Sequence, residues 1–251
     1  MEEIPKIIHY CWFGGKPIGK KAKRCIKSWK KYLPDFEIQR WDESNFDVNM
    51  IPFTSEAYAA KKFAFLTDYA RFWILYNHGG LYFDIDVELI KPLHHIVANG
   101  AFMGCERDWD PSKPAEYLGV NPGLGVGGPA GHPFFKKMMG FYQKRHFFDE
   151  NGNPDYTTVV NLTTNVLVDS GLKNSDKIQR VEDVNVYPRR YFCPMDIDTR
   201  QIELSEDTCS IHYYNGSWLS RTERFKSKIK PIVGARLTRF VIGLKGNFFR
   251  R

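Results

Sequence analysis

The sequence predicts an α/β fold in which helices flank a doubly wound, mostly parallel sheet. Strand and helix patterns alternate over the first third of the chain, in the order strand, helix, strand, helix, strand. Of the 251 residues, 43% are hydrophobic, which is enough for a large buried core. Because no repeat or clear linker interrupts the first part, we expect a catalytic-size domain over residues 1–220 and a tail over residues 221–251.

Each predicted element follows from a local pattern. Residues 4–13 are an apolar run that ends at two glycines, which indicates a buried first strand. Residues 20–32 show helical spacing with a basic outer face, and residues 37–41 favour a second strand. A longer apolar helical pattern covers residues 55–77 and ends near Gly79. Later elements are expected as helices over 132–146 and 156–169 and as short strands over 181–187 and 209–214.

Composition excludes several classes of protein. The five cysteines are odd in number and form no C-x-x-C pair, which argues against a disulfide framework and a cysteine zinc site and for a reducing cytoplasm. The start MEEIPKIIHYCW carries acids where a signal peptide carries bases. No run approaches the length of a membrane-spanning helix. We therefore expect a cytoplasmic protein.

The net charge of +7 is concentrated in the tail. Residues 221–251 contain ten Lys or Arg and one acid, a local charge of +9, so residues 1–220 carry 7 − 9 = −2. The tail also has apolar residues, and it either packs on the body or lies as a basic amphipathic segment on the inner face of an anionic membrane. The body has no basic motif to match, so we expect no nucleic-acid partner.

The segment GGLYFDIDVELIKP, residues 79–92, places acids at every second position of a predicted strand. On such a strand Asp84, Asp86 and Glu88 share one face. Three interpretations compete. The acids face solvent or pair with lysines, they form the Asp-x-Asp site of a haloacid-dehalogenase-like phosphohydrolase, or they hold a divalent cation that binds a nucleotide diphosphate.

The preceding helix supports the third interpretation. Asp68 and Arg71 are three residues apart, so they share a helix face. Their helix is apolar almost all round, which indicates burial rather than a surface ion pair. A buried carboxylate and guanidinium suit a ligand that carries hydroxyl and phosphate groups.

The run from Ala64 to Leu93, which contains D-Y-A-R, G-G-x-Y and D-x-D, resembles the sugar-binding region of family-32 glycosyltransferases. These include capsular-polysaccharide transferases and yeast initiating mannosyltransferases, and the catalytic domains of the large clostridial glucosylating toxins are related. The opening IPKIIHYCWFGG and the late segment IHYYNGSW also match. The resemblance implies the GT-A fold, a Rossmann-like nucleotide-binding sheet joined to an acceptor-binding region, with Mn²⁺ or Mg²⁺ as cofactor.

The resemblance also implies roles for individual residues. On the donor side, Trp12 would stack on uracil with His9 nearby, although Trp12 also fits an ordinary core aromatic. Asp68 and Arg71 would hold the donor sugar, and Asp84 would contact ribose and sugar.

The implied metal site combines Asp86 and Asp84 with His212 and Asn215, although either of the last two could be structural. Ser217 and Trp218 would contact the diphosphate.

A glycine-rich run, residues 123–128, satisfies the dinucleotide fingerprint G-x-G-x-x-G. Such a fingerprint should open a helix within the first strand-helix-strand unit, whereas this run lies mid-chain and continues into prolines. We interpret it as a glycine-rich strand beside the acceptor, with Asn121 as an acceptor contact.

The predicted function is retaining, metal-dependent transfer of a hexose from a nucleotide sugar to a surface or capsular glycan, in which the acceptor could be lipid-linked. A UDP-sugar is favoured over GDP-mannose as the donor. The alternatives are a haloacid-dehalogenase-like sugar phosphatase and a non-catalytic nucleotide-sugar-binding protein. The sequence leaves the sugar, the acceptor and the oligomeric state open.

Overall fold

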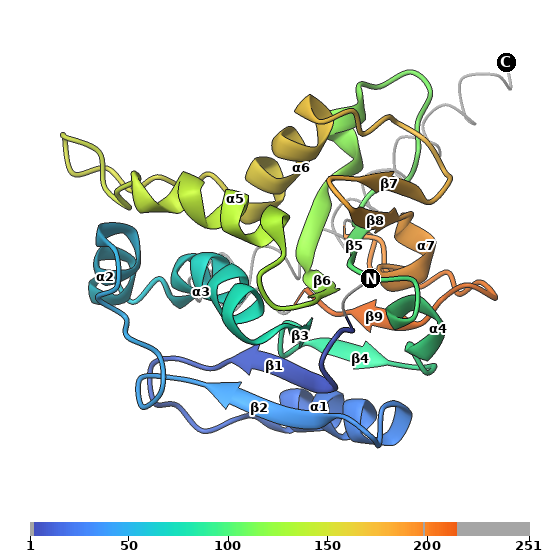
Figure 1. Ribbon diagram of the computed structural model, residues 1–251, viewed down its shortest axis with the longest axis horizontal. Coiled ribbons are helices and arrows are strands. Elements are labelled where there is room, and N and C mark those ends of the chain that lie inside the picture. Colours follow the sequence, from blue (N-terminus) through green and yellow to red (C-terminus); the bar gives the residue numbers. More distant parts are fainter. Residues whose placement is uncertain (1–2, 198, 215–251) are drawn as a thin grey trace, which may run out of the picture.

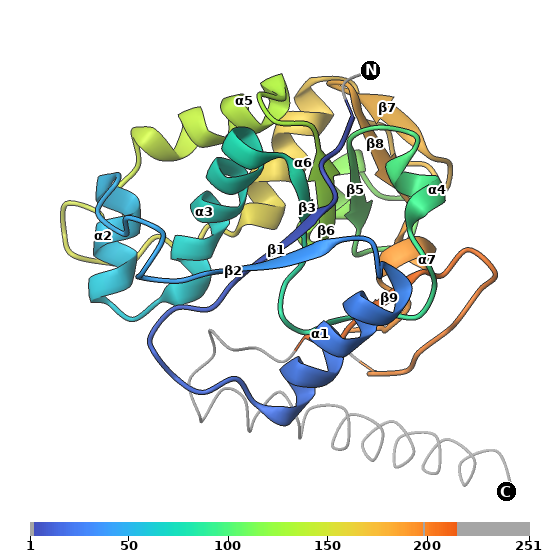
Figure 2. The same ribbon diagram turned by 60° about the horizontal axis from the view of Figure 1, so that its bottom comes forward.

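The computed structural model describes residues 3–197 and 199–214, which form a seven-stranded sheet with helices on both faces (Figures 1 and 2). In spatial order the strands are β2 (Glu37–Trp41), β1 (Ile7–Cys11), β3 (Gly80–Tyr82), β6 (Val120–Gly128), β5 (Phe102–Cys105), β8 (Val184–Tyr187) and β7 (Gln179–Val181). Five of them, β1, β2, β3, β5 and β8, run in the same direction, and β6 and β7 run against them. The predicted α/β fold with a mostly parallel sheet is therefore confirmed.

Two hydrophobic cores lie on the two faces of this sheet. One face carries α2 (Pro52–Ala59), α3 (Phe63–His78), α5 (Pro133–Gln143) and α6 (Val159–Asp169) (Figure 2). The other face carries α1 (Lys20–Tyr32), α4 (His94–Val97) and α7 (Arg189–Phe192). Successive residues of a strand point to opposite faces of the sheet. Tyr82 packs in the core on the α3 side, and Leu81 packs in the core on the α1 side.

The acid-bearing segment is not one strand, and this part of the prediction is wrong. After β3 the chain turns, with the Val87 N–H donating to the Asp84 carbonyl over 3.0 Å. It then continues as β4 (Val87–Leu89), which pairs with β9 (Ser210–His212) in a separate two-stranded sheet. The turn between β3 and β4 therefore holds Asp84 and Asp86, and Glu88 does not share a strand face with them.

The predicted helix over residues 55–77 is two helices, α2 and α3. At the end of α2, Lys61 adopts the left-handed conformation with φ 58°, and the Lys62 N–H donates to the Ala57 carbonyl over 2.8 Å. This hydrogen bond satisfies a terminal carbonyl and ends the helix. The predicted strand over residues 181–187 is likewise a hairpin, because Glu182 and Asp183 both have positive φ, as a two-residue turn between β7 and β8 requires.

The glycine-rich run lies in β6, after the short 3₁₀ helix η1 (Ala115–Leu118), so the predicted glycine-rich strand is confirmed. The five cysteines are buried free thiols. Among the described helices, none combines the length and apolar character that crossing a bilayer would require. The tail over residues 221–251, and with it the predicted membrane contact, lies outside the described residues.

Candidate active site

Asp84, Asp86 and His212 come together at the edge of the sheet where the parallel strands β1 and β3 end. Pairing of β4 with β9 places Val87 opposite His212, and this brings the late histidine beside the turn that holds the two acids. His212 Nε2 lies 3.1 Å from Asp86 Oδ1. One ligand atom from each of the three residues lies within 4.8 Å of the other two. We call these three residues the acid cluster.

The acid cluster fits a divalent cation. Two ligands on opposite sides of an octahedral Mg²⁺ or Mn²⁺ are about 4.2 Å apart, since each bond is about 2.1 Å long. The three ligand atoms of the acid cluster lie within 4.8 Å of one another, so small side-chain adjustments would bring them onto one ion. Two carboxylates and one imidazole form a ligand set of mixed oxygen and nitrogen atoms. Such a set suits Mn²⁺ better than Mg²⁺, because Mg²⁺ prefers oxygen ligands only. Three protein ligands would leave coordination positions for diphosphate oxygens.

Charges around His212 favour its protonated form. Burial of the ring lowers its pKa, but the negative charges of Asp86, Asp84 and Glu106 raise it, and the pKa is above its usual value. The imidazole is only 8% exposed, so these charges act on it with little screening by water. The surroundings of His212 are thus strongly negative, and they are suited to accept a positive ion.

Arg71 on α3 links the acid cluster to the carboxylate of Asp68. Its Nη2 atom donates to Asp68 Oδ1 over 2.9 Å and lies 3.6 Å from Asp84 Oδ1. The Arg71 side chain is 4% exposed, so the predicted burial of this pair is confirmed and a surface ion pair is excluded. Tyr82 contributes in two ways, because its hydroxyl donates to Asp84 Oδ1 over 3.0 Å and its ring lies 5.1 Å from the Arg71 guanidinium.

Burial changes the pKa values of Asp68 and Arg71. Burial raises the pKa of Asp68 to about 7, although the positive charge of Arg71 acts to lower it. Burial also lowers the pKa of Arg71, but Asp84 and the other nearby groups raise it above its usual value, so the guanidinium stays charged. Arg71 Nη1 is buried and has no hydrogen-bond partner among the described residues. The guanidinium therefore retains a donor for a ligand.

Gly123 and Glu106 also belong to the site. Gly123 begins the glycine-rich run that was predicted beside the acceptor, whereas Glu106 was not among the predicted site residues. The Asp84 N–H donates to the Gly123 carbonyl over 3.1 Å, and the Gly123 N–H donates to Asn121 Oδ1 over 2.7 Å. Asn121 Nδ2 in turn donates to Glu106 Oε2 over 2.8 Å, and Tyr214 donates to the same oxygen over 3.4 Å.

A signal for Glu106 existed in the sequence. It directly follows β5, which runs parallel to β1 and β3, and its strand end therefore lies at the same edge as Asp84. Asn121, predicted as an acceptor contact, has its side chain 7% exposed and engaged with Glu106 and Gly123.

His9 and Trp12 lie in different environments. Both ring nitrogens of His9 are used inside the protein, Nε2 with the Gly79 carbonyl over 2.9 Å and Nδ1 with the Trp41 indole N–H over 3.0 Å. Burial lowers the pKa of His9 to about 4, so the ring is neutral. Trp12 is half-buried directly after β1, at the sheet edge that holds Asp84, and its indole N–H donates to the Lys16 carbonyl over 2.5 Å.

Three predicted residues, Asn215, Ser217 and Trp218, lie outside the described residues. Glu88, the third acid of the segment, is turned away from the acid cluster toward α1. It forms a two-pronged ion pair with Arg24, at 2.9 and 2.6 Å. This pair joins β4 to α1 and explains Glu88 as a structural residue.

Comparison with known proteins matches the part of the chain that carries Asp68, Arg71, Asp84 and Asp86. Residues 19–103 match the family described as glycosyltransferase sugar-binding region containing DXD motif. Inositol phosphoceramide mannosyltransferase 1 of Schizosaccharomyces pombe is 28% identical over 45% of this chain and 40% of its own length. Inositol phosphoceramide mannosyltransferase 3 of the same yeast is 32% identical over 54% of this chain and 36% of its own. This chain thus spans less than half the length of both yeast relatives.

An uncharacterized glycosyltransferase of Acanthamoeba polyphaga mimivirus is 27% identical over 77% of this chain and 74% of its own length. Among solved structures, a glycosyltransferase involved in glycosylation of the PBCV-1 major capsid aligns with a TM-score of 0.47 at 12% identity, over 88% of this chain and 97% of that one. The PaToxG glycosyltransferase aligns with a TM-score of 0.44 at 22% identity, over 64% and 69%. The sequence matches show that this chain is homologous to glycosyltransferases and carries their sugar-binding region with its DXD motif, Asp84-Ile85-Asp86.

Proposed function

We propose that this protein is a metal-dependent glycosyltransferase that moves a hexose from a nucleotide sugar to a hydroxyl group of a glycan. The observation that carries the proposal is the joining of the acid cluster to the buried Asp68–Arg71 pair through Asp84. One part of this site suits a metal-bound diphosphate, and the other suits sugar hydroxyls. A phosphohydrolase needs the first part only.

Asp84, Asp86 and His212 would hold the cation, with Asn215 as a further candidate. A divalent cation bound there would neutralise the charge that develops on the diphosphate as the sugar leaves. The role of the chain is to keep three ligands in place before the cation arrives. Tyr82 and Arg71 hold Asp84, and the pairing of β4 with β9 holds His212 beside Asp86.

Asp68 and Arg71 would bind the donor sugar. A carboxylate accepts hydrogen bonds from two sugar hydroxyls, and the guanidinium donates from a fixed planar fork. Because both side chains are already held against each other in a dry site, little orientation is lost when the sugar binds. Trp12, at the same sheet edge, would stack on the base of the nucleotide.

The transfer step would retain the configuration of the sugar. The bond between the sugar anomeric carbon and the diphosphate oxygen breaks, and the acceptor oxygen attacks from the same face. The acceptor proton passes to the departing phosphate oxygen, so no carboxylate nucleophile is required. Stabilisation of the leaving diphosphate and positioning of the acceptor would supply most of the rate enhancement.

A UDP-hexose is the favoured donor, and a surface or capsular glycan, free or lipid-linked, is the proposed acceptor. The names of the two yeast relatives specify mannosyl transfer to inositol phosphoceramide, so GDP-mannose is the second donor to test. With a lipid-linked acceptor, the basic tail would hold the enzyme at the inner face of the membrane.

The test is Asp86→Asn measured against Glu88→Gln as the matched control two residues away. Nucleotide sugars are screened by thermal shift with and without Mn²⁺, and donor hydrolysis is then measured for the ones that bind. We expect Asp86→Asn to lose about 100-fold of the Mn²⁺-dependent hydrolysis, while Glu88→Gln keeps it.

Full activity of Asp86→Asn would show that the metal assignment is wrong. Phosphate release from sugar phosphates without any nucleotide would favour a phosphohydrolase instead. Donor binding without any turnover in the wild type would favour a binding protein.

A further inference from the structure

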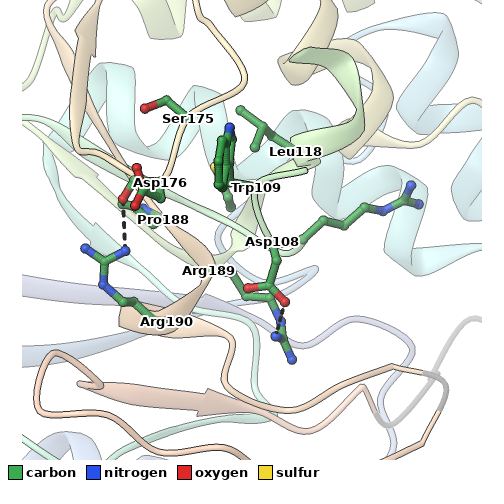
Figure 3. A pocket seen from close by; sticks show the side chains of 10 residues that line it. Asp108, Trp109, Leu118, Ser175, Asp176, Pro188, Arg189 and Arg190 are labelled. Atoms are coloured by element: carbon green, nitrogen blue, oxygen red, sulfur yellow. Dashed lines mark hydrogen bonds and ion pairs between the residues drawn. The ribbon is translucent and has the colours of Figure 1, made fainter. Parts of the chain in front are cut away.

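A pocket lies on the far side of the loop that follows β5, outside the acid cluster (Figure 3). Its walls come from this loop, from η1, and from the segments before β7 and at the start of α7. The residues that matter for its chemistry are Trp109, Leu118, Ser175, Asp176, Arg189 and Arg190. None of them has a role in the proposed donor site.

Trp109 forms an open aromatic surface in this pocket. The residue is 47% exposed, and among the described residues no aromatic ring or cation stacks on it. Figure 3 shows the indole standing between Leu118 and the segment with Ser175 and Asp176. Exposing so large an apolar face costs free energy, which a ligand with an apolar face of its own would recover.

Polar groups surround the indole at fixed positions. Arg190 donates to the Asp176 carbonyl over 2.9 Å, and Arg189 donates to Asp108 Oδ2 over 2.5 Å (Figure 3). Arg190 also donates to Asp207 Oδ2 over 2.7 Å. Among the described residues, no donor meets the Asp176 carboxylate. The pocket therefore offers an apolar ring face, a free acceptor and oriented guanidinium donors.

The chemical class that matches this combination is a saccharide. One face of a pyranose ring consists of C–H groups, which pack on an indole, and its rim consists of hydroxyls that both donate and accept. A pocket with one apolar platform and a few placed polar groups binds such a molecule in a defined orientation.

Glu106 lies in the same loop as Trp109 and connects this loop to the donor site. Glu106 lies three residues before Trp109, so the two residues are at most roughly 10 Å apart along the chain. On the other side, Glu106 accepts from Asn121 and Tyr214, and through Asn121 it connects to Gly123 and Asp84. A saccharide of one or two further units would span this separation.

We propose that the Trp109 pocket binds a saccharide unit of the acceptor, one or two residues away from the hydroxyl that receives the hexose. This inference rests on the proposed function, and it adds a binding site for a further sugar unit of the glycan acceptor. In the bound state the sugar ring lies on Trp109, and its hydroxyls donate to Asp176 and accept from Arg189 or Arg190.

The test follows the indole itself and needs no turnover. The full chain is labelled with 5-fluorotryptophan, and Trp109→Phe identifies the Trp109 resonance in the ¹⁹F spectrum. Methyl α-mannoside, methyl β-galactoside, methyl β-glucoside and lactose are then titrated, with UDP and Mn²⁺ in a separate arm. We expect a saccharide to shift the Trp109 resonance, and lactose to act at a lower concentration than a single hexose.

Asp176→Ala is expected to weaken this saccharide binding about tenfold, because it removes a charged hydrogen-bond acceptor. Phe141→Ala, an exposed aromatic on the distant α5, is the control and should leave the titration unchanged. The proposal is overturned if no saccharide moves the Trp109 resonance at millimolar concentration, or if UDP with Mn²⁺ moves it as strongly. Failure of the donor function would appear separately, as a lack of any Mn²⁺-dependent nucleotide-sugar binding in the thermal-shift screen.

Discussion

Replacing Gly123 by alanine should disable the acid cluster while leaving the fold intact. A Cβ atom at this position would lie 2.1 Å from Asp84 Oδ2 and 2.9 Å from Asp84 Cγ. Since contacts closer than about 3.0 Å are not tolerated, the carboxylate must move by about 1 Å. The moving group is the end of a flexible side chain, so we expect an unfolding cost of only about 1–3 kcal/mol.

The effect on function should be much larger than the effect on stability. A displacement of this size takes Asp84 Oδ1 away from the Tyr82 hydroxyl at 3.0 Å and from Arg71 at 3.6 Å. It also misplaces one of the three cation ligands. A misplacement of 1 Å at a reacting centre costs about 100-fold in rate, and we expect Mn²⁺-dependent donor hydrolysis to fall by that factor.

The assay combines donor hydrolysis, Mn²⁺ affinity from thermal shift, and urea unfolding. Gly140→Ala is the matched control, because nothing lies within 4 Å of the new Cβ and the residue is within α5. It should keep full activity and gain about 0.5–1 kcal/mol of stability from helix propensity. If Gly123→Ala keeps both its Mn²⁺ affinity and its hydrolysis rate, Asp84 is not a ligand whose position matters, and the proposed site is wrong.

Two further changes test the buried pair on α3. Arg71→Lys keeps the positive charge but loses the planar guanidinium that reaches both Asp68 and Asp84. Donor hydrolysis should therefore fall at least about tenfold, while the circular dichroism spectrum stays unchanged. Wild-type kinetics in this variant would show that the guanidinium geometry is unimportant. Asp68 has its pKa raised to about 7 by burial, whereas in the unfolded chain it is near 3.8. The folded state then binds more protons between these values, and the free energy of unfolding of the wild type should fall relative to Asp68→Asn as pH rises from about 4 to 7. Urea titrations of both proteins across this range measure the difference, and a flat or rising difference would contradict the assigned burial.

The local patterns determined the main elements and the chemistry of the site. A continuous apolar run identified the first strand, and helical spacing with a basic outer face identified the α1 helix, because burial leaves such local patterns in the sequence. The same reasoning identified Asp68 and Arg71 as a buried pair, since their helix is apolar on nearly every side. The D-x-D motif was recognisable because its spacing is short and local.

Tertiary structure decided which distant residues meet, apart from His212, which the family resemblance had already placed with Asp84 and Asp86. The spacing of Asp84 and Asp86 predicted one strand face, but the chain turns after β3, and β4 pairs with β9 instead of continuing in the main sheet. Gly123 was noted only as part of the glycine-rich run, and Glu106 carried no motif. The order of β3, β6 and β5 in the sheet places Gly123 beside Asp84 and Glu106 beside Asn121. Periodicity in the sequence indicates which face of a helix or strand is buried. What that face contacts depends on strand order and on pairing between strands that lie more than a hundred residues apart, and no local pattern encodes this pairing.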